Sequence, residues 1–216
     1  MESSGQISYE EVVAWIKRFA AVVAENKVYL TDLDSPIGDG DHGTNLDRGF
    51  HVVLTKLDEQ APGDIGVLLK TVSAALMSNV GGASGIFYYG FFGKLGATTA
   101  GKATISLSDF LAGFDAGVAD IERRGKAVLG DKTMLDTLIP ARDALRRSLD
   151  DGASPSAALN AAVEAADKGM LATIPLVARK GRASYLGERS AGHQDPGATS
   201  SDLLIRAARD EWIGEN

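Results

Sequence analysis

Residues 8–34, SYEEVVAWIKRFAAVVAENKVYLTDLD, set the fold class because they carry a pattern that recurs along the chain. Their apolar residues stand three and four positions apart, while Glu, Lys and Arg occupy the other face. This spacing is typical of an amphipathic α-helix with one buried stripe. Ser8 is a suitable N-cap, with Glu11 three residues later as its capping-box partner. The stretch predicts a long helix that begins near Ser8.

Most of the remaining sequence repeats this helical period, and strand signals are nearly absent. Further helices are predicted at 44–58, 65–79, 85–98, 108–124, 132–149, 155–179 and 199–213. Gly, Pro and capping residues separate these segments, as expected of loops between helices. Pro140 and Pro175 fall inside predicted helices, which they should kink or restart. Eight helices with mostly short loops predict an all-α fold, an eight-helix antiparallel up-and-down barrel or bundle.

Length and composition favour one domain over residues 1–216. A chain of 216 residues with 44% hydrophobic content can bury one good core, and it has no cysteine for disulfides. The N-terminus lacks the basic start and unbroken apolar stretch of a secretory signal. No run approaches the ~18 apolar residues that a transmembrane helix needs. We therefore expect a soluble, cytoplasmic protein.

The charge balance argues against two classes of partner. Lys and Arg total 22 against 29 Asp and Glu, which gives a net charge of -7. A chain-wide attraction to nucleic acid or to an anionic membrane is therefore not expected. An anionic ligand would have to be held locally, by metal ions, helix N-termini and a few arginines.

Three aspartates stand close together in LDSPIGDGDHGTN, residues 33–45. Asp34, Asp39 and Asp41 repel one another unless a positive group sits between them, and Gly38 and Gly40 let the backbone turn sharply enough for them to converge. Hard carboxylate oxygens suit Mg²⁺, which completes its shell with waters and substrate phosphates. Two such ions could share three aspartates, as is typical of phosphoryl transfer.

The same turn has a simpler interpretation. Asp-Gly-Asp is common in surface turns, and Asp41 or Thr44 could merely be the N-cap of the next helix. A calcium-binding EF-hand is excluded, because no acidic residue stands at the twelfth position counted from Asp34 or Asp39. The capped turn and the magnesium site both remain open from the residues alone.

NVGGASGIF, residues 79–87, predicts a helix N-terminus with exposed N–H groups and close backbone access. Ser84 could donate a hydrogen bond to a phosphate oxygen. Glycine and serine at a helix start also serve as caps and allow tight helix packing, so the signal is weak by itself. No Gly-Lys-Ser/Thr follows, which excludes a Walker loop.

Two later loops carry weaker signals. In ERRGKAVLGDKTMLD, residues 122–136, Gly125 would let a base or ribose approach and Met134 could pack on the base. An ordinary loop with Asp131 or Thr133 as the cap of the next helix is the simpler interpretation, and we favour it. KGRASYLGERSAGHQDPGATSSD, residues 180–202, is long, rich in glycine and contains arginines suited to phosphate contact. It is either a lid or a solvated loop.

In this order and spacing, LDSPIGDGDHGTN, GGASG, GKAVLGDKTMLD and GRASYLGERSAGHQDPGA together resemble the nucleotide-binding L subunits and domains of the dihydroxyacetone kinase family. The resemblance covers essentially the whole chain. It implies an eight-helix barrel with the nucleotide at one end, in agreement with the helix count. One departure is Ile86 and Phe87, where the family commonly has a Pro-Leu-like pair; it should alter helix packing more than phosphate chemistry.

The resemblance also implies roles for individual residues. Asp34, Asp39 and Asp41 match the aspartates that hold two Mg²⁺ ions on the nucleotide phosphates. The resemblance also implies residues that bind ATP or ADP, at the phosphate end of the site, around the adenine and ribose, and in the closing loop. They are His42, Asn45, Gly82, Ser84, Gly85, Gly125, Met134, Arg182, Asp195 and Gly197.

The family divides its labour between chains. A separate K subunit holds dihydroxyacetone, and the L subunit brings the nucleotide. In the phosphotransferase-linked form a third subunit, M, rephosphorylates bound ADP, whereas in the ATP-dependent form the nucleotide exchanges. The resemblance therefore implies a subunit that is inactive alone and that transfers phosphate by positioning and charge neutralisation.

Three alternatives remain open at this point. The ketose could be another small sugar such as erythrulose. His42 could itself carry a phosphoryl group, making the chain a phosphorelay protein. The chain could also be a non-catalytic regulator that binds a transcription factor, a role compatible with an acidic helical surface.

Overall fold

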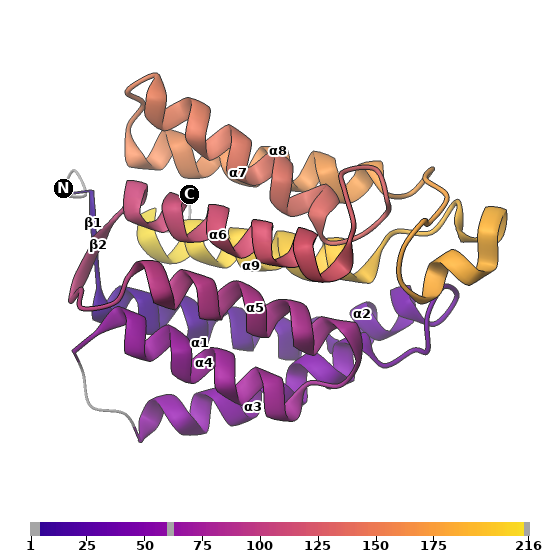
Figure 1. Ribbon diagram of the computed structural model, residues 1–216, viewed down its shortest axis with the longest axis horizontal. Coiled ribbons are helices and arrows are strands. Elements are labelled where there is room, and N and C mark those ends of the chain that lie inside the picture. Colours follow the sequence, from indigo (N-terminus) through magenta and orange to yellow (C-terminus); the bar gives the residue numbers. More distant parts are fainter. Residues whose placement is uncertain (1–4, 60–62, 214–216) are drawn as a thin grey trace.

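The computed structural model describes residues 5–59 and 63–213. Most of them are helical, and the long helices run along the long axis of the molecule (Figure 1). The α-helices are α1 (Tyr9–Glu25), α2 (Lys27–Asp34), α3 (His42–Asp58), α4 (Ile65–Asn79), α5 (Gly82–Thr98), α6 (Leu107–Gly125), α7 (Leu135–Asp150), α8 (Pro155–Ala172) and α9 (Pro196–Ile213). A 3₁₀ segment, η1 (Arg182–Ser190), and two short strands, β1 (Gln6–Ser8) and β2 (Thr104–Ser106), complete the described elements.

The long helices form a closed antiparallel ring. From α3 onward each packs against the next along the chain, α1 packs against α3, and α9 returns to pack against α1. Within the described residues, α1 and α3 to α9 correspond to the eight helical segments that the sequence predicts. The prediction of an all-α up-and-down barrel is confirmed.

The core explains why α1 forms where the sequence predicts it. The Ser8 hydroxyl accepts the N–H of Glu11 at 3.2 Å, and the Glu11 carboxylate accepts the N–H of Ser8 at 2.7 Å, so the capping box is present. Trp15 on the buried face lies at the centre of an aromatic cluster, with ring centroids 5.2–5.9 Å from those of Phe92, Phe110 and Trp212. Phe110 lies near the start of α6 and Trp212 near the end of α9, so this cluster fills the core toward the β1–β2 end and leaves the other end of the barrel to the loops.

Two predicted helices end earlier than expected. The first breaks at Asn26, whose backbone (φ -97°, ψ 10°) departs from helical geometry and whose side-chain amide donates to the Val22 carbonyl at 2.9 Å. The predicted helix 155–179 ends at Ala172, because Pro175 lacks an N–H and disfavours helical geometry at the residue before it. Pro140, by contrast, lies inside α7 as predicted. Both helices therefore end at the same end of the barrel, where the chain continues into α2 and into the long connection before α9.

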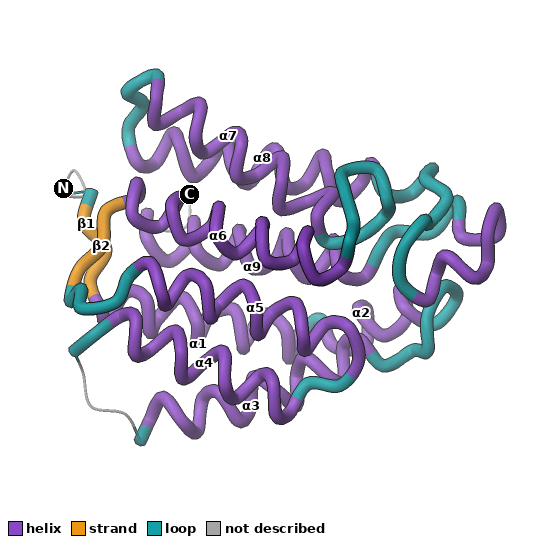
Figure 2. Tube along the Cα trace, in the orientation of Figure 1, coloured by secondary structure: helices purple, strands orange, loops and turns teal. Residues whose placement is uncertain are grey.

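Loops at that end differ in character from those at the other. The turn 35–41, the loop 126–134 and the long connection from α8 to α9 gather at the right of Figure 2, whereas β1 and β2 lie at the left. The strands pair antiparallel with Ile7 opposite Ile105, a pairing that their three-residue length left without a sequence signal. No helix of the described residues is long and apolar enough to cross a bilayer.

Candidate functional site

The three aspartates of the turn converge as the sequence predicts. Each of Asp34, Asp39 and Asp41 offers a carboxylate oxygen, and these oxygens all lie within 4.8 Å of one another. Asp41 stands at the N-cap position of α3, but its side chain makes no capping hydrogen bond. The capped-turn interpretation therefore fails for Asp41, whose carboxylate is left to face the other acids.

Close backbone packing holds Asp34 in place. One carboxylate oxygen, Oδ2, accepts the backbone N–H groups of Asp41 at 2.9 Å and of His42 at 3.2 Å. A Cβ on Gly38 would lie 1.9 Å from the other oxygen, Oδ1, so only glycine fits there. Gly40 has φ +69°, which favours glycine as well. The result is a buried, fixed carboxylate next to two more accessible ones, a donor set that fits Mg²⁺.

Arg182 connects the acidic turn to the long connection before α9. Its Nη2 lies 2.9 Å from Oδ2 of Asp39, and the arginine side chain is 65% exposed. Arg182 is the first residue of η1, the orange segment that projects beyond the barrel in Figure 1. A cation from this projecting segment thus reaches the carboxylates, a contact that the sequence could not predict.

His42 links three helices behind the turn. Its Nδ1 lies 2.9 Å from Ser84 Oγ on α5, and its Nε2 lies 2.9 Å from Ser200 Oγ on α9. The Tyr88 hydroxyl donates to the same Ser200 oxygen at 2.9 Å. Burial lowers the pKa of His42 to about 4, although the charges of Asp34 and Asp41 act in the opposite direction. The imidazole is therefore neutral at pH 7 and holds Ser84 by a hydrogen bond.

A cavity of about 140 Å³ opens beside this network. The predicted site residues that line it are His42, Ser84, Met134, Arg182, Asp195 and Gly197. Lining residues that the sequence reasoning missed include Phe87, Tyr88, Lys132, Thr133 and Lys180. Phe87 ends the stretch NVGGASGIF and Tyr88 follows it. Their helical spacing of three and four residues from Ser84 was the signal that could have found them.

Besides the three aspartates of the turn, four of the residues predicted to bind the nucleotide lie outside the cavity wall. The Asn45 amide oxygen accepts from Arg48 at 2.7 Å, and Gly82 has open space where a side chain would be. A Cβ on Gly85 would lie 2.2 Å from the Val80 carbonyl oxygen, so this glycine permits tight packing at the start of α5. Gly125 lies behind Phe87, 3.2 Å from its ring by the same measure.

The loop that carries Met134 is shaped by Asp136. The Asp136 carboxylate accepts the N–H of Gly130 at 2.6 Å and that of Thr133 at 2.7 Å. Of the two expected caps of the next helix, Asp131 is wrong, whereas the Thr133 hydroxyl accepts the N–H of Leu135, the first residue of α7, at 3.2 Å. The N-cap position itself is held by Met134, which has no side-chain cap. An acid from inside the first turn of α7 organises the loop instead.

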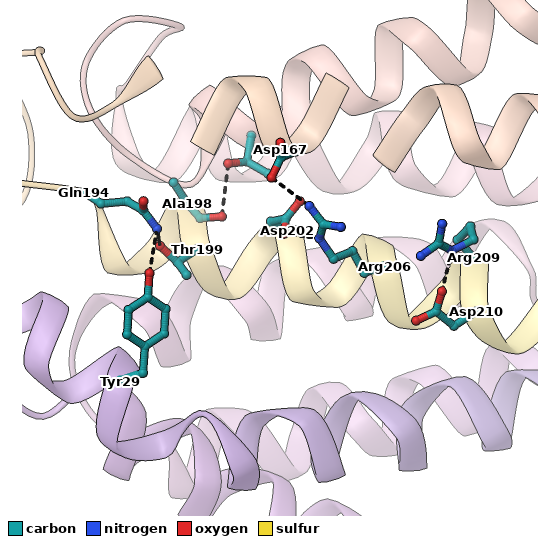
Figure 3. Close-up of polar contacts among 10 residues, drawn as sticks. Tyr29, Asp167, Gln194, Ala198, Thr199, Asp202, Arg206, Arg209 and Asp210 are labelled. Atoms are coloured by element: carbon teal, nitrogen blue, oxygen red, sulfur yellow. Dashed lines mark hydrogen bonds and ion pairs between the residues drawn. The ribbon is translucent and has the colours of Figure 1, made fainter. Parts of the chain in front are cut away.

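The segment that enters α9 is tied to its neighbours by side-chain bonds. Gln194 donates to the Tyr29 hydroxyl at 3.3 Å and to Thr199 Oγ1 at 2.8 Å, bridging α2 and α9 (Figure 3). The next residue, Asp195, accepts the N–H of Ala198 at 2.7 Å. Burial raises the pKa of Asp195 to about 7, with the Asp136 charge acting in the same direction. Further along α9, Arg206 binds Asp167 of α8 at 2.7 Å and fixes the helix against the barrel (Figure 3).

The structure is an all-α barrel with an acidic turn and a cavity at one end. Comparison with known proteins identifies its family. The family model of the DAK2 domain matches residues 36–210, and the chain belongs to this family. It is 44% identical over 200 residues to "PEP-dependent dihydroxyacetone kinase, ADP-binding subunit DhaL" of Escherichia coli (strain K12), a match that covers 93% of this chain and 95% of the relative.

Two further similarities agree with this assignment. The chain is 39% identical over 199 residues to the "PTS-dependent dihydroxyacetone kinase, ADP-binding subunit DhaL" of Lactococcus lactis, covering 92% of this chain and 95% of that one. The crystal structure of the dihydroxyacetone kinase from C. freundii in complex with AMP-PNP and Mg²⁺ superposes with a TM-score of 0.69 at 23% identity. That match covers 92% of this chain and 34% of the kinase, and supports the fold. The resemblance inferred from the sequence motifs is confirmed.

Proposed function

We propose that this chain is the nucleotide-binding, phosphoryl-transfer subunit of a dihydroxyacetone kinase. It would present a magnesium nucleotide to dihydroxyacetone held on a separate K subunit, and would be inactive alone. The observation that carries the proposal is the convergence of three carboxylates within 4.8 Å, one of them fixed by backbone N–H groups. Such a cluster is costly to assemble unless cations bind to it.

Asp34, Asp39 and Asp41 would hold two Mg²⁺ ions. When bound, the ions neutralise the charge of the phosphate oxygens during transfer. The carboxylates serve as ligands and move no proton, so the chain needs no nucleophile of its own. Arg182, which contacts Asp39, would also be able to bind the phosphate oxygens of a nucleotide at the turn.

The cavity beside the turn would receive the nucleoside. Met134 and Phe87 offer apolar surface for a base, and Ser84 stands at the N-terminal end of α5, where backbone N–H groups favour phosphate. At about 140 Å³ the cavity is smaller than the roughly 300–1,000 Å³ of typical ligand sites, so the projecting segment around Arg182 must move to admit a nucleotide.

The surface around this end supports a partner subunit. Apart from Val67 near the start of α4, the exposed large apolar side chains of the described residues lie on α2, at the end of α4, the start of α5, the end of α8, in the loop 126–134 and on η1, all at the site end of the barrel (Figure 1). They are Val28, Tyr29, Met77, Ile86, Val128, Leu129, Leu171 and Tyr185, the last 89% exposed. Apolar side chains gathered around one site are typical of an interface, and a K subunit bearing the ketose fits this position.

The donor is the second part of the proposal. The relatives named above are PEP- and PTS-dependent ADP-binding subunits, so we propose that this chain retains ADP and works with a phosphotransferase M subunit. In this proposal the site residues of this chain bind the nucleotide, and the partner subunit selects the ketose. The phosphorelay alternative is disfavoured, because both ring nitrogens of buried His42 are already hydrogen-bonded to serines.

Calorimetric titration of ADP in the presence of Mg²⁺ tests the metal role. Asp39→Asn should weaken binding at least about tenfold, by analogy with the loss of other groups that support a metal site. Asp32→Asn is the matched control, because Asp32 is an exposed acid on α2 that lies outside the cluster. An unchanged dissociation constant for Asp39→Asn would refute the proposal.

Reconstitution tests the activity and the donor. The purified chain should not phosphorylate dihydroxyacetone, whereas addition of a K subunit together with either ATP or a phosphotransferase donor should produce product. Native mass spectrometry of gently purified protein should find ADP still bound. Turnover with ATP alone, with ADP lost on desalting, would favour the exchanging form of the kinase.

A further inference from the structure

Lys132 is a buried cation whose partners are all main-chain atoms. The residue lies in the loop between α6 and α7 and is 1% exposed. Its Nζ lies 2.5–3.4 Å from five carbonyl oxygens, those of Thr173, Ile174, Leu176, Ser190 and His193. An ammonium group has three N–H bonds to donate, so the acceptors outnumber the donors. The cage resembles the carbonyl coordination of a bound potassium ion more than a lysine ion pair.

The five carbonyls belong to the two ends of one segment. We call residues 177–192, in the connection from α8 to α9, the lid. The carbonyls of Thr173, Ile174 and Leu176 lie just before the lid, and those of Ser190 and His193 lie at its other end. The ends also touch each other, because the N–H of Gly192 donates to the Ile174 carbonyl at 2.7 Å. Lys132 reaches both ends by hydrogen bonds from a third part of the chain. The loop that carries Lys132 also binds the lid through its backbone, because the N–H of Arg179 donates to the Asp131 carbonyl at 3.0 Å.

The arrangement requires a charged amine. A neutral amine would point its lone pair at carbonyl oxygens, whereas an ammonium replaces lost hydration with converging carbonyl dipoles. Burial lowers the pKa of Lys132, and the charges of Asp195 and Asp136 oppose that shift. Neither acid is hydrogen-bonded to the Lys132 ammonium in the structure. The charge therefore serves to gather main-chain segments.

We propose that Lys132 is a positioning residue whose ammonium acts as a built-in monovalent cation that pins both ends of the lid. The pin holds the lid base against the loop that carries Thr133 and Met134. Movement is then confined to the outer lid, where Gly181 and Gly187 have positive φ, and this outer part carries Arg182 to Asp39. This role of Lys132 does not depend on which nucleotide or ketose is used.

A lysine that only adds to overall stability would behave differently. Its loss would expose the lid no more than another substitution that lowers the free energy of unfolding by the same amount. Loss of a residue that pins the lid would instead free the lid while the barrel stays folded. Trypsin can tell the two apart, because Arg179, Lys180, Arg182 and Arg189 place cleavage sites along the lid and its base. Cleavage there, followed by mass spectrometry, reports lid opening without any ligand or activity.

Lys132→Met is the direct test, because methionine has similar length and no donor. Lid cleavage should be at least about tenfold faster than in the unaltered chain, the factor that corresponds to losing one charge-assisted hydrogen bond. Val163→Ala, a cavity variant in the core face of α8, is the control for a comparable loss of melting temperature. Equal lid cleavage in both variants, or no change in Lys132→Met, would overturn the proposal.

Chemical rescue tests the cation itself. In Lys132→Ala, potassium or ammonium ions should enter the carbonyl cage and restore slow cleavage of the lid, whereas tetramethylammonium is too large and has no N–H. The same salts should leave the unaltered chain unchanged. Rescue by tetramethylammonium to the same extent, or by none of the cations, would contradict a carbonyl cage built for a small cation.

Hydrogen exchange on the unaltered protein keeps the proposal testable if the variants do not fold. The N–H groups of Ala178, Arg179 and Gly192, at the lid base, should exchange slowly, close to the rate of the barrel helices. The outer lid around Gly187 should exchange much faster. A lid base that exchanges as fast as the outer lid would show that Lys132 pins nothing.

Discussion

Gly38→Ala places one methyl group against the carboxylate of Asp34. Gly38 does not have a positive φ, so the substitution acts by steric contact and not by backbone strain. The new Cβ would lie 1.9 Å from Asp34 Oδ1 and 2.8 Å from its Cγ, whereas real contacts stay beyond 3.0 Å. The carboxylate must therefore retreat by about 1 Å, a displacement that a packed interior resists.

This retreat breaks the hydrogen bonds that fix the site. Oδ2 of Asp34 accepts two backbone N–H groups at 2.9 and 3.2 Å, and both would be stretched past bonding distance. Hydrogen bonds to a charged group contribute about 1.5–3 kcal/mol each, so partial relaxation leaves a loss of roughly 2–4 kcal/mol in the free energy of unfolding. Displacement of a carboxylate ligand should also weaken Mg·ADP binding by roughly 10–100-fold.

Urea unfolding and calorimetric titration measure the two effects on the same preparation. Gly152→Ala is the control, because Gly152 has φ +74° and lies in the α7–α8 loop, at the end of the barrel away from the site. It should lose some stability through backbone strain and bind Mg·ADP normally. Normal Mg·ADP affinity in Gly38→Ala would refute the claim that close packing on Asp34 holds the site.

Three further variants test the rest of the site and the core. The pKa of Asp195 is raised to about 7 in the folded chain, so this group contributes stability that is complete below its unfolded pKa of about 4 and is lost as pH rises through 7, by at most about 4 kcal/mol. Asp195→Asn should therefore gain stability relative to the unaltered chain between pH 5 and pH 8 in thermal unfolding; a constant difference over that range would count against a raised pKa. Tyr88→Phe removes the donor to Ser200 and should cost about 1–2 kcal/mol in urea unfolding, and a loss within error of zero would mean that the Ser200–His42 network does not depend on it. Trp15→Ala should cost about 3–5 kcal/mol in the same assay yet leave the Mg·ADP affinity of the folded protein unchanged, because the aromatic cluster lies toward the β1–β2 end of the barrel, away from the site; a large change in affinity would contradict that separation.

Local features of the site could be predicted from the sequence because their causes are local. Asp34, Asp39 and Asp41 converge because glycines a few residues away permit a sharp turn, and the capping box of α1 spans three residues. The helical period likewise identified the eight long helices, since each buries one stripe against its neighbours.

Contacts between distant residues could not be predicted in this way. The carbonyls around Lys132 lie 41 to 61 positions away along the chain, and no spacing rule connects a single lysine to them. The ion pair between Arg182 and Asp39 likewise depends on how the lid folds back over the turn. The break at Asn26 was missed because the apolar pattern continues across it, from α1 into α2.

A crystal structure of the chain grown with ADP and Mn²⁺ in place of Mg²⁺ tests the central claim most directly, because manganese is located by its anomalous scattering. We predict two manganese peaks coordinated by Asp34, Asp39 and Asp41, each also bound to a phosphate oxygen of ADP. ADP bound elsewhere, or a turn without manganese and with its three carboxylates directed into solvent, would contradict the account.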